Sequence, residues 1–255
     1  MRFIDSHCHL DFSEFNGQRE AIIANAQALG VEQFIVPGIS LAQSQQLLDF
    51  SQHHGPIHIG AGLHPYFLSQ HASEHIVGLG ELATAHKHRW CAIGECGLDR
   101  SIGEMDKQVA LFEAQIALAN ELALPLIVHH RQSHDLIAAS FKRCQPRYGG
   151  VIHAFSGSEQ VAKYYIKLGF KLGVGGTITY ARSVKTQQAL RSVAIEHLLL
   201  ESDAPSMPLC GYQGQINTPE RIPQVFIALA RLLQCQDLSA LSEQLYFNCL
   251  AFLRK

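Results

Sequence analysis

The fold is decided by the segment FIDSHCH at residues 3–9 and by seven later short apolar segments. FIDSHCH starts with a short apolar run and ends in His7, Cys8 and His9. Because successive side chains of a strand point to opposite faces, both imidazoles are predicted to point one way and the thiol the other. The segment is therefore predicted to be a strand that ends in two histidines on one face.

Eight short apolar or β-branched runs alternate with longer stretches of helical periodicity, which is typical of strand–helix units on a parallel sheet. Successive runs begin about 28 residues apart, so eight units account for all 255 residues. An open doubly wound sheet would usually show fewer strands and a glycine-rich first turn. We therefore predict an α/β fold, a (β/α)8 TIM barrel in a single domain over 1–255, with an extra C-terminal helix. The predicted strands are 3–6, 34–37, 57–60, 91–94, 126–128, 151–152, 171–174 and 198–200.

Three of the intervening helices have clear boundaries. The stretch 105–124 repeats apolar residues at helical spacing and is stopped by Pro125. The stretch 158–168 begins with Ser-Glu and is followed by Gly169, a typical C-terminal cap. The Thr-Pro pair at 218–219 predicts another helix start.

Composition is typical of a compact globular protein. Hydrophobic residues make up 47% and charged residues 16%, which argues against disorder and against a coiled coil. With 20 Lys and Arg against 22 Asp and Glu, the formal net charge is −2. No global field then attracts nucleic acid or an anionic membrane, so a polyanionic substrate must be held by local groups.

The N-terminus and the cysteines favour the cytoplasm. The first apolar patch is followed at once by acid and histidine, which leaves no room for a secretory segment, and no stretch is long enough for a membrane-spanning helix. Seven cysteines without a CxxC pair are a poor framework for disulfides or structural zinc. We expect a cytoplasmic monomer with reduced thiols and no membrane or obligate protein partner.

Five of the eight predicted strands end in histidine or carboxylate residues. In a parallel barrel these ends meet at the mouth, where barrel enzymes carry their chemistry. One such residue is as easily a hydrogen-bonded core residue, but five would need five independent coincidences. Besides His7 and His9, the strand-end residues are Glu95, His129, His130, His153, Glu201 and Asp203.

Imidazole and carboxylate ligands together suit several transition metals, and a carboxylate can bridge two ions. Six ligands are too many for one open tetrahedral ion but enough for two. We therefore predict two divalent metal ions, for which these ligands would suit Zn, Mn, Fe or Ni, with Glu95 as the bridge. The first and last strands are neighbours in a closed barrel, which places His7 and His9 beside Asp203. Glu95, His129 and His153 form the other group, because they come from three consecutive strands. The predicted ligands are His7, His9, Glu95, His129, His153 and Asp203.

Six motifs, spread in order over nearly the whole chain, resemble those of the TatD-type metal-dependent deoxyribonucleases of the amidohydrolase-like superfamily. The resemblance implies a (β/α)8 barrel, metal ligands at the six residues already chosen, and Mg- or Mn-dependent DNase activity, often of the 3′ exonuclease kind. The motifs are HCHLD at 7–11, GLHP at 62–65, IGECGLD at 93–99, VHHR at 128–131, IHAFSG at 152–157 and ESDAP at 201–205.

The chain departs from the family's pattern at four positions. His130 stands where a small residue such as Ser is usual, Ser202 replaces Thr, and Cys249 replaces Thr in an Asn-Thr pair. Ile216 stands where an Arg commonly precedes the Asn-x-Pro element. Losing that Arg removes a possible phosphate contact, so the departures bear on substrate choice more than on chemistry.

Further roles follow from position. Asp203 is expected to act as a catalytic residue together with Glu95, accepting the proton of the attacking water. His64 and Arg131 are candidate substrate contacts, the latter because a guanidinium matches phosphate. Glu201 and Asp5, each two residues before a ligand, are candidates for orienting ligands, although both could be ordinary core hydrogen bonders.

The remaining aromatic side chains are less informative. Nine further histidines fall mostly in predicted helices or the loops after them, and we expect nearly all of them at the surface. Four aromatic residues near strand ends could stack on bases, but core or loop packing is the commoner role for each. The histidines are 53, 54, 58, 71, 75, 86, 88, 134 and 197, and the aromatic residues are Tyr66, Phe67, Phe155 and Tyr180.

These observations favour a divalent-metal-dependent phosphodiester hydrolase, a 3′ exonuclease-like deoxyribonuclease that acts on single-stranded DNA ends through a metal-activated water. An alternative is a related binuclear barrel hydrolase acting on a small phosphoester, ester or amide. A dihydroorotase-like form is disfavoured because strand 4 ends in Glu95 and no carboxylated Lys is available there. A non-enzymatic metal-stabilised module is also disfavoured by the complete ligand set.

Overall fold

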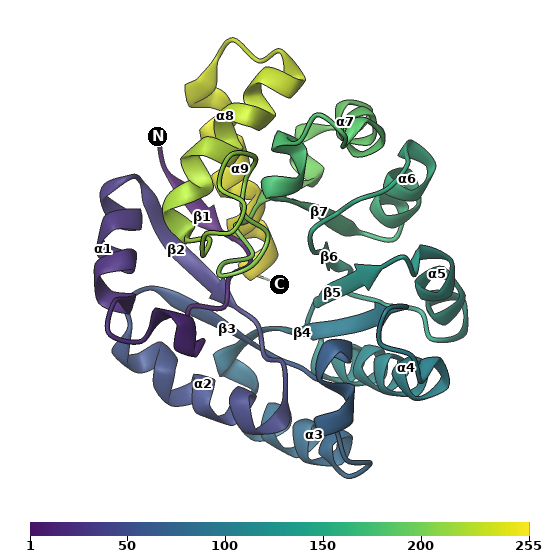
Figure 1. Ribbon diagram of the computed structural model, residues 1–255. Helices are drawn as coiled ribbons and strands as arrows, with labels where there is room; N and C mark the ends of the chain where they lie inside the picture. The colour runs from purple at the N-terminus through teal and green to yellow at the C-terminus, as the bar shows by residue number, and fades with distance from the viewer. Residues whose placement is uncertain (255) are drawn as a thin grey trace.

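The structure is a computed structural model that describes residues 1–254. One parallel sheet contains eight strands in chain order. Figure 1 shows the helices following one another around these strands, from purple α1 to yellow-green α8. The strands are β1 (Phe3–Asp5), β2 (Val31–Val36), β3 (Ile57–Ala61), β4 (Trp90–Asp99), β5 (Leu126–Arg131), β6 (Gly150–Ile152), β7 (Phe170–Val174) and β8 (Leu198–Leu200).

Each strand is followed by at least one helix, as the predicted barrel requires. The helices are α1 (Arg19–Ala28), α2 (Leu41–His53), α3 (His75–Ala85), α4 (Met105–Leu122), α5 (His134–Arg143), α6 (Glu159–Lys167), α7 (Val184–Arg191), α8 (Ile222–Leu233) and α9 (Leu238–Leu253). Short 3₁₀ helices span Ser13–Phe15, Pro65–Gln70, Lys87–Arg89, Gly176–Thr179, Ile195–His197 and Pro219–Arg221.

The barrel closes between its first and last strands just beyond their ends. The Ser6 N–H donates to the Leu200 carbonyl over 2.9 Å, and the Asp203 N–H donates to the His7 carbonyl over 2.9 Å. These bonds join the two chain segments that carry predicted metal ligands. The contacts that close the barrel therefore also bring these predicted ligands together.

The opposite end of the barrel is filled by α9, the extra helix predicted at the C-terminus. Tyr246, Cys249 and Phe252 of this helix are buried against an inner apolar cluster. In Figure 1 the helix crosses the centre of the strand ring. The inner cluster contains Ile4, Ile35, Ala92, Ile127, Val151 and Leu199, from six different strands.

The predicted (β/α)8 barrel is confirmed, and the element boundaries differ in instructive places. β4 runs on to Asp99, so Glu95 lies inside the strand and not at its end. Helix α4 stops at Leu122 because Ala123 adopts a left-handed conformation with φ 57°. The Thr-Pro pair at 218–219 starts a 3₁₀ turn that leads into α8.

Within the described residues, no single helix is long and apolar enough to cross a membrane. The bent pair Pro219–Leu233 and Leu238–Leu253 meets the length and composition criteria only when the two helices are taken together. Both helices bury apolar residues in the core.

We predict that Gly150→Ala destabilises the barrel by about 3 to 5 kcal/mol. Gly150 has φ 154°, and an added Cβ would overlap the Leu126 carbonyl on the neighbouring strand. The matched control is Gly103→Ala, where φ is 81° but nothing lies within 4 Å, so only backbone strain of about 1 to 2 kcal/mol is expected. Equal losses in urea unfolding would contradict the account of strand packing.

Candidate metal centre

Two-residue alternation along β5 and β6 positions two histidines of the candidate metal centre. Ile127 on β5 and Val151 on β6 belong to the inner apolar cluster. His129 and His153 follow two positions later and so point into the same interior. A polar layer therefore lies directly on the apolar floor of the barrel.

Glu95 lies at the centre of this layer, with histidines on both sides of its carboxylate. One oxygen, Oε1, is 3.0 Å from His64 Nε2 and 3.1 Å from His129 Nδ1. The other, Oε2, is 3.0 Å from His7 Nε2 and 3.6 Å from His9 Nε2. Its two oxygens thus face different histidine pairs, which is the arrangement expected of a bridging carboxylate.

Asp203 faces a partly overlapping set of histidines. Its Oδ1 is 3.5 Å from His153 Nε2, 3.6 Å from His7 Nε2 and 3.8 Å from His9 Nε2. The rings of His7 and His153 stack with centroids 3.5 Å apart. His153 therefore lies with His7 and Asp203, whereas strand order alone had grouped it with Glu95 and His129.

Glu201 lies beside the Nδ1 atom of His153. Its Oε1 lies 3.1 Å from His153 Nδ1 and accepts the Ala154 N–H over 2.6 Å. A Cβ on Gly173 would overlap the Glu201 carboxylate, so the glycine makes room for it. The structure thus places Glu201 against a predicted ligand, as its position in the sequence suggested.

Asp5 acts on the backbone that carries the ligands. Its carboxylate accepts from the Ser202 hydroxyl at 2.5 Å, the Ser202 N–H at 2.9 Å and the His7 N–H at 3.2 Å. Asn217 Nδ2 donates to the Ser202 carbonyl over 2.7 Å. Asp5 therefore ties the His7 segment to the Asp203 segment and does not itself reach a ligand ring.

The contact between Asp99 and His129 was not predicted from the sequence. Asp99 Oδ2 lies 3.4 Å from His129 Nε2, while Oδ1 accepts from the hydroxyl and N–H of Ser101. The signal was present in the motif 93–99, but the strand was predicted to end at residue 94. Because β4 is longer than predicted, Asp99 comes level with β5 at Arg131.

Burial and charge act in opposite directions on the ionisable groups of the centre. Burial alone would raise the pKa of Glu95, but the surrounding histidines, His64 and His7 foremost, hold it well below its usual range. Burial and the nearby His7 lower the pKa of His9 to about 3. Burial would also lower the pKa of His153, but the nearby carboxylates, Glu201 foremost, raise it well above its usual value. The buried carboxylates thus favour a positive charge on the groups that lie between them.

The donor set fits a divalent cation. The Nε2 atoms of His7 and His9 are 3.3 Å apart and face the same carboxylate, while the Nδ1 atom of each ring has no hydrogen-bond partner among the described residues. Buried carboxylates without compensating charge are costly, and a bound cation supplies that charge. Three overlapping groups have donor atoms within 4.8 Å of one another: His7, His9 and Glu95; His7, His153 and Asp203; His64, Glu95 and His129.

The other predicted residues divide between the mouth and the core. His64 lies inside the cluster beside Glu95, and Arg131 is exposed at the end of β5. His130 points away from the centre and packs on His134, with ring centroids 4.2 Å apart. His71 is buried, contrary to the expected surface position, because its Nε2 lies 2.9 Å from the His64 carbonyl.

Of the four aromatic candidates, Phe155 is buried in the core and carries no exposed ring. Tyr66 is 60% exposed, and Phe67 and Tyr180 are half-buried. Tyr180 is the one whose hydroxyl is fixed, because it donates to the Pro208 carbonyl over 2.7 Å.

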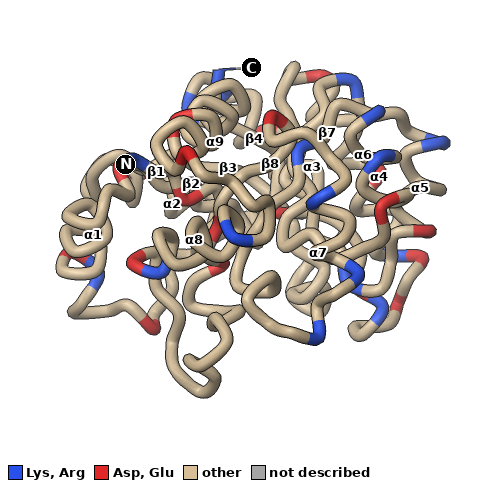
Figure 2. The backbone as a smooth tube through the Cα atoms, turned by 90° about the horizontal axis from the view of Figure 1, so that it is seen from above, with Lys and Arg blue, Asp and Glu red and all other residues tan. Residues whose placement is uncertain are grey.

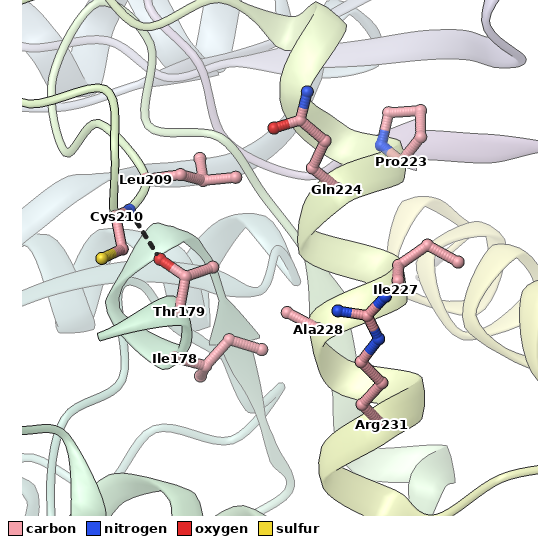
Figure 3. Close-up of a pocket in the computed structure, with 9 residues that line it drawn as sticks. All are labelled: Ile178, Thr179, Leu209, Cys210, Pro223, Gln224, Ile227, Ala228 and Arg231. Atoms are coloured by element: carbon pink, nitrogen blue, oxygen red, sulfur yellow. Dashed lines mark hydrogen bonds between the residues drawn. The ribbon is translucent and has the colours of Figure 1, made fainter. Parts of the chain in front are cut away.

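A groove of about 590 Å³ lies apart from the metal centre, between the 3₁₀ helix Gly176–Thr179 and α8. Figure 3 shows Ile178 and Leu209 facing Ile227 and Ala228 across it, with the Cys210 N–H donating to Thr179 Oγ1. No histidine or carboxylate lines this groove. It therefore offers none of the metal-ligand side chains that surround Glu95.

Comparison with known proteins decides the family. The sequence model described as "TatD related DNase" matches residues 4–254. The chain belongs to the TatD DNase family. It is therefore a metal-dependent hydrolase that acts on ester bonds, and the resemblance seen in its motifs is confirmed.

Two kinds of TatD relatives stand out. The uncharacterized metal-dependent hydrolase YjjV of Escherichia coli K12 is 40% identical over 91% of this chain and 90% of that protein. Its crystal structure, described as a TatD homolog, superposes with a TM-score of 0.94, covering 100% of this chain and 98% of that one at 37% identity. The 3′-5′ ssDNA/RNA exonuclease TatD of Klebsiella pneumoniae is 34% identical over 79% of this chain and 77% of that protein.

We predict that Mn²⁺ at a hundred times its dissociation constant stabilises the protein by about 2.7 kcal/mol and that EDTA removes the effect. Glu95→Gln should lose most of this stabilisation, because Glu95 faces two of the three donor groups. Thermal unfolding with and without Mn²⁺ measures it, with Glu81→Gln on the exposed side of α3 as the control. A Mn²⁺ response that Glu95→Gln leaves intact would refute the placement of the metal.

Proposed function

We propose that this TatD-family hydrolase is a 3′ exonuclease-like deoxyribonuclease that uses two divalent ions to cleave the ends of single-stranded DNA. The observation that carries the proposal is the position of Glu95, whose two oxygens face separate histidine pairs. Relatives whose names state 3′-5′ ssDNA/RNA exonuclease activity support the choice of substrate. We take residues 1–255 as one catalytic domain that works as a monomer in the cytoplasm, where its seven free cysteines remain reduced.

Two sets of residues would hold the ions. We assign His7, His9 and Asp203 to one ion and His129 to the other, with Glu95 shared between them. We also assign His64, which the sequence had indicated as a substrate contact, to the second ion because it lies in one donor group with Glu95 and His129. His153 lies closest to Asp203 and His7 and would complete the first set. When bound, paired divalent ions lower the pKa of water and neutralise charge on phosphoryl oxygens. Mg, Mn or Zn would satisfy this mixed set of donors.

Asp203 is the carboxylate of the cluster best placed to take a proton from water. Its side chain is 13% exposed, against 2% for Glu95, so solvent reaches it more readily. Burial opposes ionisation of Asp203, but the adjacent His153 lowers its pKa, so the group is ionised and able to accept. We assign proton transfer to Asp203 and bridging to Glu95.

Arg131 would hold a phosphate at the rim. It lies two residues beyond His129 on β5 and is exposed. No carboxylate within 4 Å pairs with its guanidinium among residues 1–254. Basic and acidic positions are interspersed over the molecule in Figure 2. Without a continuous basic surface, the protein is expected to bind a few nucleotides and not a long duplex.

The decisive assay compares 3′- and 5′-labelled single- and double-stranded oligonucleotides with bis(p-nitrophenyl) phosphate, each with Mg²⁺ or Mn²⁺ and with EDTA. We expect stepwise loss of nucleotides from the 3′ end of single strands, abolished by EDTA. Clear turnover of the small diester with no cleavage of any DNA would overturn the nuclease proposal and favour a small-ester hydrolase.

Asp203→Asn is expected to lower kcat by a factor of about 10² to 10⁴, the usual contribution of a positioned acid or base. Asp49→Asn on the exposed face of α2 is the matched control and should leave kcat unchanged. Steady-state kinetics at saturating Mn²⁺ separates loss of proton transfer from weaker metal binding. Wild-type kcat in Asp203→Asn would exclude this residue as the base.

A further inference from the structure

A second, smaller cavity lies between the loops that follow β7 and β8, the second of which also carries Asp203. Its volume is about 190 Å³, and no carboxylate lines it. Its polar groups are hydroxyls and one guanidinium, a combination that suits an anionic and not a cationic ligand. The lining residues are Thr177, Tyr180, Arg182, Ser183, Met207 and Pro208.

Backbone contacts fix this cavity to the segment that carries Asp203. The Ser206 N–H donates to the Asp203 carbonyl over 2.7 Å, so the chain turns tightly from the ligand into the cavity wall. Asn217 Nδ2 lies 3.4 Å from the Met207 carbonyl. A Cβ on Gly176 would lie 2.6 Å from the same Met207 oxygen, so the two loops are in direct contact. The cavity wall therefore has a set position relative to the cluster.

Tyr180 and Arg182 give the cavity its chemical character. The Tyr180 hydroxyl donates to the Pro208 carbonyl over 2.7 Å, which fixes the ring. The Arg182 guanidinium lies 4.7 Å from the centroid of that ring, and its side chain is exposed. No carboxylate in the described part of the chain forms an ion pair with Arg182. Its charge is therefore not neutralised by a carboxylate, which leaves it able to pair with a phosphate.

The neighbouring groove of Figure 3 lacks this combination. Thr179 lines that groove and Tyr180 the smaller cavity, so the two lie on either side of one short segment. The groove is walled by aliphatic side chains of the 3₁₀ helix and α8 and contains no aromatic ring. The groove does contain one guanidinium, that of Arg231. Bases stack chiefly on aromatic rings, and of the two sites only the smaller cavity has one, Tyr180.

We propose that this cavity is a nucleotide subsite, in which Tyr180 stacks on a base near the cleaved end of the strand and Arg182 holds an adjacent phosphate. The inference rests on the proposed nuclease function and names the residues that would give it nucleotide recognition. The β7 and β8 loops would then supply part of the binding energy for DNA, in addition to the metal ligands.

The test measures kcat and KM on a short single-stranded oligonucleotide and on versions with an abasic unit at each of the last three positions. Tyr180→Leu should raise KM on normal DNA by about 5- to 100-fold, with kcat little changed. Tyr180→Phe, which keeps the ring, should stay within about threefold of wild type. On the oligonucleotide whose abasic unit occupies the subsite, Tyr180→Leu should cost nothing further, because the stacking partner is already missing.

Arg182→Ala should raise KM by about 3- to 30-fold and weaken its dependence on salt. Arg147→Ala is the control, since Arg147 is exposed just before β6, at the opposite end of the barrel. Equal effects of Tyr180→Leu on normal and abasic strands would overturn the stacking assignment. An unchanged KM in Arg182→Ala would overturn the phosphate contact.

Binding of a fluorescent oligonucleotide in EDTA separates this proposal from the proposed function. If wild-type protein cleaves no DNA but binds the oligonucleotide more tightly than Tyr180→Leu and Arg182→Ala, the nuclease function fails and the subsite stands. If it cleaves DNA and the two variants behave as wild type in both assays, the function stands and the subsite fails. Melting temperatures of all variants establish that they are folded.

Discussion

The alternation of side chains in a closed barrel is the constraint on which the rest of this structure depends. An inward apolar residue, such as Ile127 or Val151, forces the residue two positions later to point into the same interior. With α9 filling one end, the polar residues of the next layer are left at the other. The hydrogen bond from Asp203 to the His7 carbonyl then joins the first and last strands at that layer. Folding and site assembly share the same backbone contacts.

Electrostatics explains why this layer favours metal. Glu95 and Asp203 lie within 4 Å of several imidazoles, and the carboxylates raise the pKa of His153 while burial lowers that of His9. Such a cluster is poorly balanced by its own protons, because some rings favour the neutral form and others the charged one. A bound metal would balance the charge of the carboxylates and would supply a metal-activated water for a TatD-family hydrolase. The residues around the cluster mainly orient it: Glu201 toward His153, and Asp99 toward His129.

Much of the fold and of the site could be predicted from the sequence, because both follow from local patterns. Strand runs, helix stops and ligand-type residues at strand ends depend on period and on residue type. The pairing of His153 with His7, the contact of Asp99 and the burial of His71 could not be predicted in this way. The Asp99 contact depends on the length and register of β4, which shifts between Ile93 and Cys96, and the other two depend on contacts between segments far apart in the sequence or in irregular loops. The cavity at Tyr180 is formed by two loops. Loops lack the periodic patterns from which strands and helices are predicted, so the cavity could not be predicted either.

The central claim is that the Glu95 cluster holds two divalent ions. Anomalous diffraction from crystals soaked in Mn²⁺, collected at the manganese edge, tests it most directly. The account predicts two peaks that share Glu95, one toward His7 and His9 and the other toward His129. A single peak would contradict the two-ion arrangement, and no peak within the cluster would contradict the metal centre itself.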